Sequence, residues 1–94
     1  MAGMESILNE KKECYFCRTT QNLEKHHIFR GCRRQTADRL GLWVWLCHEH
    51  HTGASGVHNN TNLFRTLQQL AQVKFEQERT RLEWMQEIGK NYID

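Results

Sequence analysis

The segment from Leu46 to His58, with the sequence LCHEHHTGASGVH, contains one cysteine and four histidines. Packing alone does not account for this density, because imidazole and thiolate are the side chains that bind zinc and other late first-row metal ions. Two earlier stretches carry the same residue types: CYFC at Cys14 to Cys17, and KHHIF around His26 and His27. The way these three segments meet therefore limits what the chain can fold into.

A chain of 94 residues allows one small domain, spanning 1–94, whose limited core is often supplemented by a metal ion or disulfides. Hydrophobic residues make up 38% and charged residues 26%, which is typical of soluble globular proteins. No apolar run approaches the ~20 residues of a membrane-spanning helix, and the first residues lack the apolar core of a signal peptide. We therefore expect a cytoplasmic protein without a membrane partner, in which four cysteines favour metal binding over disulfides. A thioredoxin-like redox pair is the rival for CYFC, but no βαβ pattern surrounds it.

The apolar pattern predicts an α+β fold in three parts: a polar lead-in or short helix at 1–13, a metal-binding core at 14–58 and a helical part at 61–89. Within the core, strands are expected at Leu23 to Arg30 and at Leu42 to Leu46, forming a hairpin. The polar stretch from Gly31 to Gly41 is expected to be a loop with at most one helical turn, at Thr36 to Leu40.

Two helices are expected to cover this hairpin. Apolar residues recur at helical spacing from Leu63 to Phe75, which predicts an amphipathic helix of roughly four turns capped by Thr61 or Asn62. A second helix follows, with Thr80 and Glu83 forming a capping box at its start and Gly89 at its C-terminal cap.

Two cysteine and histidine pairs with matching spacing predict a structural zinc site. Cys14 and Cys17 form the first pair, and Cys47 and His50, about thirty residues later, form the second. A hairpin would bring the pairs together, and three thiolates with one imidazole complete the tetrahedron that structural zinc prefers. The alternative is cysteines without a metal. Cys32 has no paired partner and is interpreted as a bystander.

Four histidines remain for a second site: His26, His27, His51 and His58. Three imidazoles suit a catalytic metal site, which keeps positions open for water and substrate, while a fourth can act as a general base. The alternative is surface or core histidines in a zinc-stabilised fold. His48 is expected to be exposed.

Together these motifs, Cys-x-x-Cys, HHI on a strand, and an apolar strand ending in LC-x-x-HH, carry a resemblance. The chain resembles HNH endonucleases of the His-Me finger (ββα-metal) superfamily that carry zinc-binding Cys/His pairs. It is especially similar to small phage and prophage proteins with the pattern KHHIF, GLW, LC-x-E-H-H and GVH. The resemblance covers Cys14 to about His58, and the helical tail more loosely.

The resemblance implies a ββα-metal hairpin and hydrolysis of DNA phosphodiester bonds in a bacterial or phage-infected host cell. It implies that His27 is the general base, and that His26, His51 and His58 hold a divalent ion such as Mg²⁺, Mn²⁺, Ni²⁺ or Zn²⁺. The middle Asn of the HNH pattern aligns near Gly41 or Leu42, so its base-fixing role is vacant or has moved.

Three arginines, Arg33, Arg34 and Arg39, are candidates for contacts to DNA phosphates, with a solvated loop as the alternative. The other function considered is an inactive HNH-fold binding protein, such as a phage-encoded inhibitor of another nuclease. A protein partner or a homodimer formed through the C-terminal helices is compatible with either function.

Overall fold

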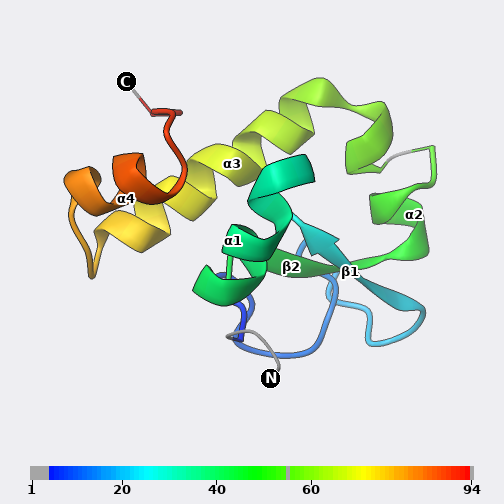
Figure 1. Ribbon diagram of the computed structural model, residues 1–94. Coiled ribbons are helices and arrows are strands. Elements are labelled where there is room, and N and C mark those ends of the chain that lie inside the picture. The colour runs from blue at the N-terminus through cyan, green and yellow to red at the C-terminus, as the bar shows by residue number, and fades with distance from the viewer. Residues whose placement is uncertain (1–4, 55, 94) are drawn as a thin grey trace.

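The computed structural model describes residues 5–54 and 56–93 and has the predicted α+β class (Figure 1). Its elements in chain order are β1 Leu23–His27, η1 Gly31–Arg33, α1 Arg34–Leu40, β2 Trp43–Cys47, α2 His48–His51, η2 Val57–Asn59, α3 Thr61–Glu76 and α4 Arg81–Glu87. None of the described helices is long and apolar enough to cross a membrane.

The predicted hairpin is present, with both strands placed differently from expectation. β1 and β2 pair antiparallel with Leu23 opposite Cys47 and His27 opposite Trp43. β1 stops at His27 rather than Arg30 because its pairing with β2 ends opposite Trp43 and the chain then turns into η1 at Gly31, which has a left-handed φ of 62°. β2 begins one residue later than predicted.

The stretch predicted as a loop, Gly31 to Gly41, is mostly helical. It contains η1 and the seven-residue α1, in which Ala37 and Leu40 are buried. Gly41 adopts a left-handed φ of 74° at the end of α1, and a Cβ there would lie 2.3 Å from the Glu5 carbonyl oxygen. No side chain caps the start of α1, so the usual sequence signal for a helix was missing.

In the segment before the first cysteine pair, residues 5–13 form no helix and are attached to Gly41 and β2, while residues 1–4 of the predicted lead-in lie outside the described residues. The Ser6 hydroxyl donates to the Trp43 carbonyl, the Ile7 N–H donates to the Gly41 carbonyl at 3.0 Å, and Asn9 Oδ1 accepts from the Trp45 N–H at 2.8 Å. Residues 5–22 contain no helix or strand.

The two C-terminal helices match the prediction closely. α3 has sixteen residues, but its N-cap is Asn60 rather than Thr61 or Asn62, because Asn60 Oδ1 accepts from the Leu63 N–H at 3.1 Å. The capping box at Thr80 is present at the start of α4, and Gly89, with a φ of 82°, follows its end.

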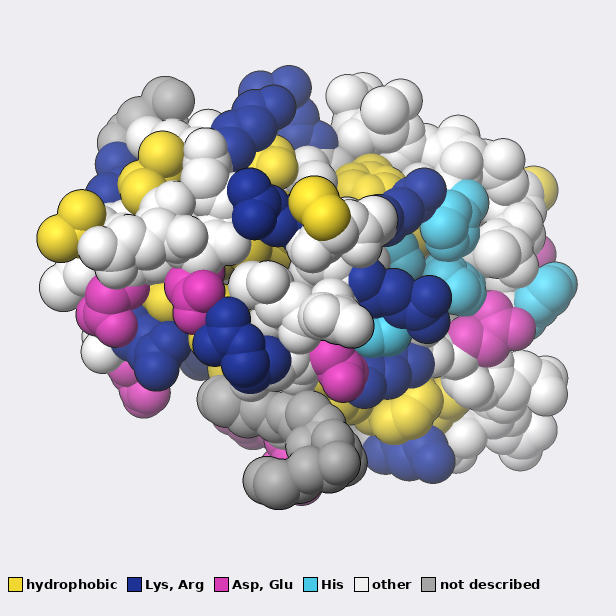
Figure 2. Space-filling view, in the orientation of Figure 1, with side chains coloured by type: hydrophobic (Ala, Val, Ile, Leu, Met, Phe, Trp, Pro, Cys, Tyr) yellow, Lys and Arg dark blue, Asp and Glu magenta, His cyan; other side chains and the backbone are white. Residues whose placement is uncertain are grey.

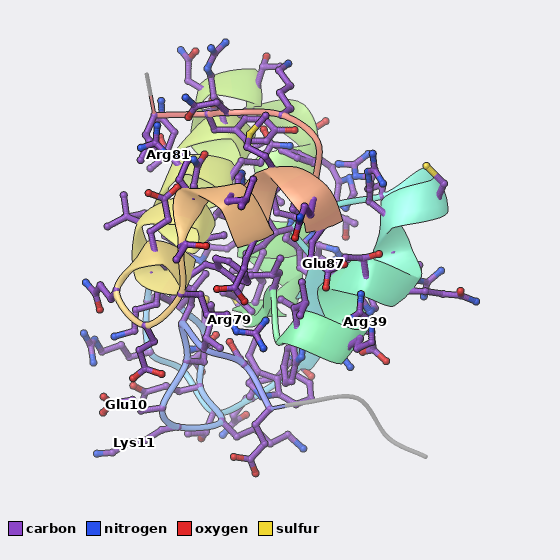
Figure 3. The ribbon with its side chains drawn as sticks, turned by 60° about the vertical axis from the view of Figure 1, so that its left-hand side comes forward. Glu10, Lys11, Arg39, Arg79, Arg81 and Glu87 are labelled. Atoms are coloured by element: carbon purple, nitrogen blue, oxygen red, sulfur yellow. The ribbon has the colours of Figure 1, made fainter. Side chains whose placement is uncertain are left out.

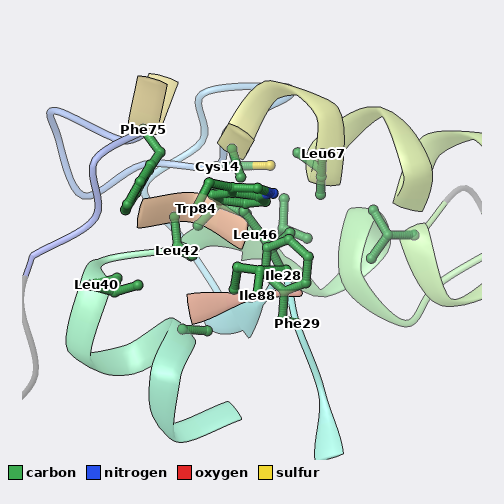
Figure 4. Packing of buried hydrophobic residues seen from close by; sticks show 14 of the residues in the cluster. Cys14, Ile28, Phe29, Leu40, Leu42, Leu46, Leu67, Phe75, Trp84 and Ile88 are labelled. Carbon is green, nitrogen blue, oxygen red and sulfur yellow. The ribbon is translucent and has the colours of Figure 1, made fainter. Parts of the chain in front are cut away.

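These helices cover the inner face of the hairpin and close the core (Figure 4). Trp84 is fully buried, with ring centroids 5.6 Å from Phe29 and 5.3 Å from Phe75, and its Nε1–H donates to the Lys90 carbonyl at 2.8 Å. Cys14 is equally buried and belongs to the same cluster, so the first cysteine pair is part of the core.

Candidate metal centres

The four residues of the predicted structural site lie together. Cys14, Cys17, Cys47 and His50 each offer one ligand atom, and these atoms lie within 4.8 Å of one another. Three of the separations are 3.7 Å from Cys14 Sγ to His50 Nδ1, 3.7 Å from Cys17 Sγ to Cys47 Sγ and 3.1 Å from Cys47 Sγ to His50 Nδ1. Around an ion with metal–sulfur bonds of about 2.3 Å, tetrahedral ligand atoms lie about 3.5–3.8 Å apart. The cluster can therefore hold a metal ion.

Local backbone geometry sets up both halves of this cluster. In the first half, the Cys14 N–H donates to the Thr19 carbonyl at 2.8 Å and the Arg18 N–H to the Cys14 carbonyl at 2.9 Å, with Arg18 at a left-handed φ of 65°. In the second half, Cys47 ends β2 and His50 follows in the turn of α2. Because the start of β1 and the end of β2 lie at the same end of the hairpin, with Leu23 opposite Cys47, the tight turn before β1 meets Cys47 and His50 there.

The thiol of Cys14 is prepared for metal binding. Burial raises the pKa of the Cys14 thiol, but hydrogen bonds from the backbone of Cys17, Cys47 and Phe16 together lower it by more than burial raises it. The pKa of Cys14 is therefore lowered to about 6. For Cys47, burial and the neighbouring thiols raise the pKa. Because the thiolate is the metal-binding form, the state favoured at Cys14 is the one a cation needs. Cys32 is exposed and outside both clusters, as expected.

The second cluster consists of His26, His51 and His58, whose ligand atoms also lie within 4.8 Å of one another. His26 comes from β1, His51 ends α2 and His58 lies in η2. The ring centroids are 5.2 Å apart for His26 and His51, 5.5 Å for His26 and His58, and 4.7 Å for His51 and His58. The strand β1 and two later segments, α2 and η2, thus deliver one imidazole each to the same point.

Two glycines bring His58 back to His51. A Cβ on Gly53 would lie 2.7 Å from the Glu49 Cα and carbonyl oxygen, and one on Gly56 would lie 2.6 Å from the His51 carbonyl oxygen. Only glycine lets the turn approach α2 this closely. The Asn59 amide then donates to the Gly53 carbonyl at 2.8 Å, which fixes the returning chain.

His26 gives the clearest indication that the histidine cluster can bind an ion. It is 2% exposed, and its Nε2 is the one buried side-chain nitrogen or oxygen of the described residues without a hydrogen-bond partner. Leaving a buried polar atom unpaired costs roughly 1–3 kcal/mol, so such atoms are rare. Burial, followed by the charges of His51 and His58, lowers the pKa of His26 to about 3. The imidazole is therefore neutral near neutral pH, which is the form that binds a metal ion.

A carboxylate that the sequence analysis did not single out orients His51. Glu24 Oε1 lies 2.7 Å from His51 Nδ1, while its other oxygen lies 3.3 Å from Nδ1 of the exposed His48. Histidine ligands usually donate their second ring nitrogen to a carboxylate, which fixes the tautomer and leaves Nε2 for the ion. The only sequence signal was position, because Glu24 stands two residues before His26 and shares its strand face.

His27 lies on the other face of β1, beside α1. Its Nε2 is 3.5 Å from Asp38 Oδ1, and the Lys25 ammonium group contacts the same oxygen. Burial lowers the pKa of His27, and the opposing effect of Asp38 does not reverse this. His27 is therefore a neutral imidazole near neutral pH, with a carboxylate next to one ring nitrogen. Asp38 was not singled out because the sequence predicted at most one helical turn at Thr36 to Leu40 and gave no sign that this turn lies beside β1.

The three candidate phosphate-binding arginines occupy different surroundings. Lys and Arg side chains lie next to the histidines on the face in Figure 2. Arg33 lines a groove beside His58, and the positive charge of Arg34 contributes to the lowered pKa of His27. Arg39 instead donates to Glu87 on α4 at 2.9 Å (Figure 3). Arg33 and Arg34 are thus the two nearer the histidines.

Comparisons of the chain with protein-family models, with curated proteins and with solved structures found no match. The function of the chain is therefore inferred from the geometry of the two clusters and from the motifs in the sequence.

Proposed function

We propose that this chain is a metal-dependent endonuclease of the HNH type, which hydrolyses phosphodiester bonds of DNA. The observation that carries the proposal is the cluster of His26, His51 and His58 around an unpaired, buried nitrogen of His26. The order of hairpin followed by α2, with His51 on that helix, supports a ββα-metal fold.

The cysteine-rich cluster is proposed to hold structural zinc. Its three thiols and one imidazole are ligands that zinc prefers, and four protein ligands leave no position for water. Because Cys14 also belongs to the hydrophobic core, zinc would hold the N-terminal segment, β2 and α2 together.

The histidine cluster is proposed to hold the catalytic ion. Three imidazole ligands leave coordination positions open for a substrate oxygen. Imidazole ligands suit Zn²⁺ or Ni²⁺ better than Mg²⁺, and Mn²⁺ lies between them. When bound, the ion supplies positive charge that neutralises the phosphate and the leaving 3′ oxygen.

His27 is proposed as the general base. With Nε2 facing Asp38, its Nδ1 lone pair is available to take a proton from the attacking water. Asp38 would hold this tautomer and stabilise the imidazolium that forms, which is the role left vacant near Gly41 and Leu42. The 3.5 Å contact is long for a hydrogen bond, as catalytic contacts often are before substrate binds.

The substrate phosphate would lie across the end of β1. Consecutive strand residues point to opposite faces, so His26 and His27 can flank one phosphate only where the strand stops, and β1 stops at His27. Arg33 ends η1 and Arg34 begins α1, the two elements that come next in the chain after β1, and both are proposed to contact flanking phosphates without reading sequence. Arg39, already paired with Glu87, contributes less.

The test is nicking of supercoiled plasmid by the purified, zinc-loaded protein in Mg²⁺, Mn²⁺, Ni²⁺ or EDTA. We expect ion-dependent nicking, which His27→Ala lowers by about 100- to 10,000-fold, the usual contribution of a general base. His48→Ala is the matched control, because it removes an exposed histidine outside both clusters. Equal nicking by wild type and His27→Ala, or none with any ion, would refute the proposal.

One observation supports the alternative of a binding protein. Four large apolar side chains on α3 and α4 are exposed: Leu70, Val73, Leu82 and Met85. A partner or a second copy of the chain would bind there, with or without catalysis. Sedimentation of the purified protein, compared with a Leu82→Glu variant, tests the homodimer: a dimer that the variant dissociates supports it, and a monomer at all concentrations excludes it.

A further inference from the structure

Arg30 and a metal ion need the same lone pair of His58. Arg30 Nη2 lies 3.0 Å from His58 Nδ1. A guanidinium has donors only, so the ring nitrogen must accept, and a neutral imidazole has a single nitrogen able to do so. In this arrangement Nδ1 uses its lone pair for Arg30 and Nε2 carries the proton.

It follows that His58 cannot bind an ion while this hydrogen bond lasts. Coordination through Nδ1 would displace Arg30 directly. Coordination through Nε2 would require the proton to move to Nδ1. A protonated Nδ1 has no lone pair left to accept the hydrogen bond from Arg30. In either case the third ligand of the cluster becomes available only when Arg30 turns away.

An open groove beside the cluster offers Arg30 another position. This groove, of about 680 Å³, is lined by Arg30, Arg33, His58, Phe64 and Tyr92 among others, and a second hollow that shares Phe64 and Tyr92 extends it to Arg65 and Lys90. The Arg30 guanidinium already lies over the Phe64 ring, 4.4 Å from its centroid. None of the described residues that line the two hollows is acidic.

A phosphate in this groove would therefore be the strongest acceptor within reach of Arg30. Arginine binds phosphate through two parallel, charge-assisted hydrogen bonds, which are about twice as strong as bonds to a neutral acceptor. Arg33 would add a second positive charge. The exposed parts of Phe64 and Tyr92 offer aromatic surface for an unpaired base next to the phosphate.

We propose that this groove binds a phosphate of a single nucleic-acid strand, and that Arg30 couples the groove to the ion site. A bound phosphate draws Arg30 away from His58, and the released lone pair completes the set of three ion ligands. The nature of the phosphate rests on the proposed function, whereas the coupling rests on the contact between Arg30 and His58. Because coupling is reciprocal, the ion must also strengthen binding of the strand by the same factor.

The experiment measures Ni²⁺ binding by calorimetry to zinc-loaded protein, alone and with a saturating single-stranded oligonucleotide whose phosphorothioate linkages resist cleavage. A methylphosphonate oligonucleotide, which has no backbone charge, is the neutral comparison. Compared with the protein alone, wild-type protein should bind Ni²⁺ at least about tenfold more tightly when the charged strand is bound, which lies within the range usual for coupled sites. The neutral strand should leave the Ni²⁺ affinity unchanged.

Arg30→Met keeps the apolar stem over Phe64 and removes the donor. It should bind Ni²⁺ without any strand about as tightly as wild type does with the strand, and adding the strand should change nothing. Arg65→Met, which removes a charge from the far hollow, should retain the coupling. Zinc content and thermal unfolding check that each variant is folded.

Three results would overturn the inference. The charged strand could leave the Ni²⁺ affinity of wild-type protein unchanged, Arg30→Met without a strand could bind Ni²⁺ only as tightly as wild type without a strand, or the neutral strand could raise the Ni²⁺ affinity as much as the charged strand does. Should Arg30→Met fail to fold, the comparison of the two strands on wild-type protein decides alone. No cleavage is needed, so coupling without nicking would refute only the proposed nuclease, and nicking without coupling would refute only the role of Arg30.

Discussion

Replacing Glu24 with alanine should weaken the histidine cluster without touching any of its three ion ligands. The Glu24 carboxylate accepts from His51 Nδ1 at 2.7 Å and so holds Nε2 toward the other two imidazoles. Hydrogen bonds to charged groups contribute about 1.5–3 kcal/mol, and the Glu24 side chain is 41% exposed, so water screens part of this. We therefore expect the loss of the Glu24 carboxylate to weaken ion binding by about 1.4 kcal/mol. This corresponds to a tenfold loss of affinity, the lower end of what outer-shell carboxylates contribute to metal sites.

The assay is calorimetric titration of zinc-loaded protein with Ni²⁺. Glu24→Ala should bind about tenfold more weakly than wild type. Glu24→Gln should fall between them, because the amide oxygen still accepts but carries no charge. His48→Ala, which removes the other partner of Glu24, should bind as wild type does. Wild-type affinity in a folded Glu24→Ala would show that packing alone orients His51.

Three further predictions concern the two clusters and the base. Removal of zinc with a strong chelator should abolish cooperative thermal unfolding as followed by near-UV circular dichroism, since zinc binding and folding are coupled in small domains; an unchanged transition would contradict this. Gly56→Ala should weaken Ni²⁺ binding while leaving zinc content unchanged, because the added Cβ meets the His51 carbonyl oxygen and displaces the turn that delivers His58. Asp38→Ala should lower kcat for plasmid nicking with little change in KM, because Asp38 contacts His27 rather than substrate; an equal rise in KM would argue against that role.

Sequence reasoning succeeded where a pattern is local. Ligand spacing indicated the cysteine-rich cluster, since Cys14 and Cys17, like Cys47 and His50, are three residues apart, whereas the three ligands of the histidine cluster were implied by the resemblance to HNH endonucleases. The capping box at Thr80 was recognised for the same reason, because it depends only on two residues three positions apart. The hairpin was found from its apolar strand, although its boundaries moved.

Sequence reasoning failed where the partner of a side chain comes from elsewhere in the chain. Glu24, Asp38 and Arg30 look like ordinary surface charges in the sequence, and only folding brings them to His51, His27 and His58. α1 was predicted only as a single turn at Thr36 to Leu40, because it has no capping side chain and buries Ala37 and Leu40 against the rest of the fold. The pairing of Arg39 with Glu87 likewise joins residues far apart in the sequence.

The attachment of residues 6–15 to β2 has a consequence for how the protein behaves in solution. A hairpin of two strands has two open edges, and an exposed strand edge can pair with the edge of another molecule and start aggregation. The polar groups of Trp43 and Trp45 on the side of β2 away from β1 are occupied by Ser6, Asn9 and Tyr15. The N-terminal segment therefore covers this edge of β2. Deleting the residues up to and including Asn9 would expose part of the edge to other molecules while leaving every metal ligand in place.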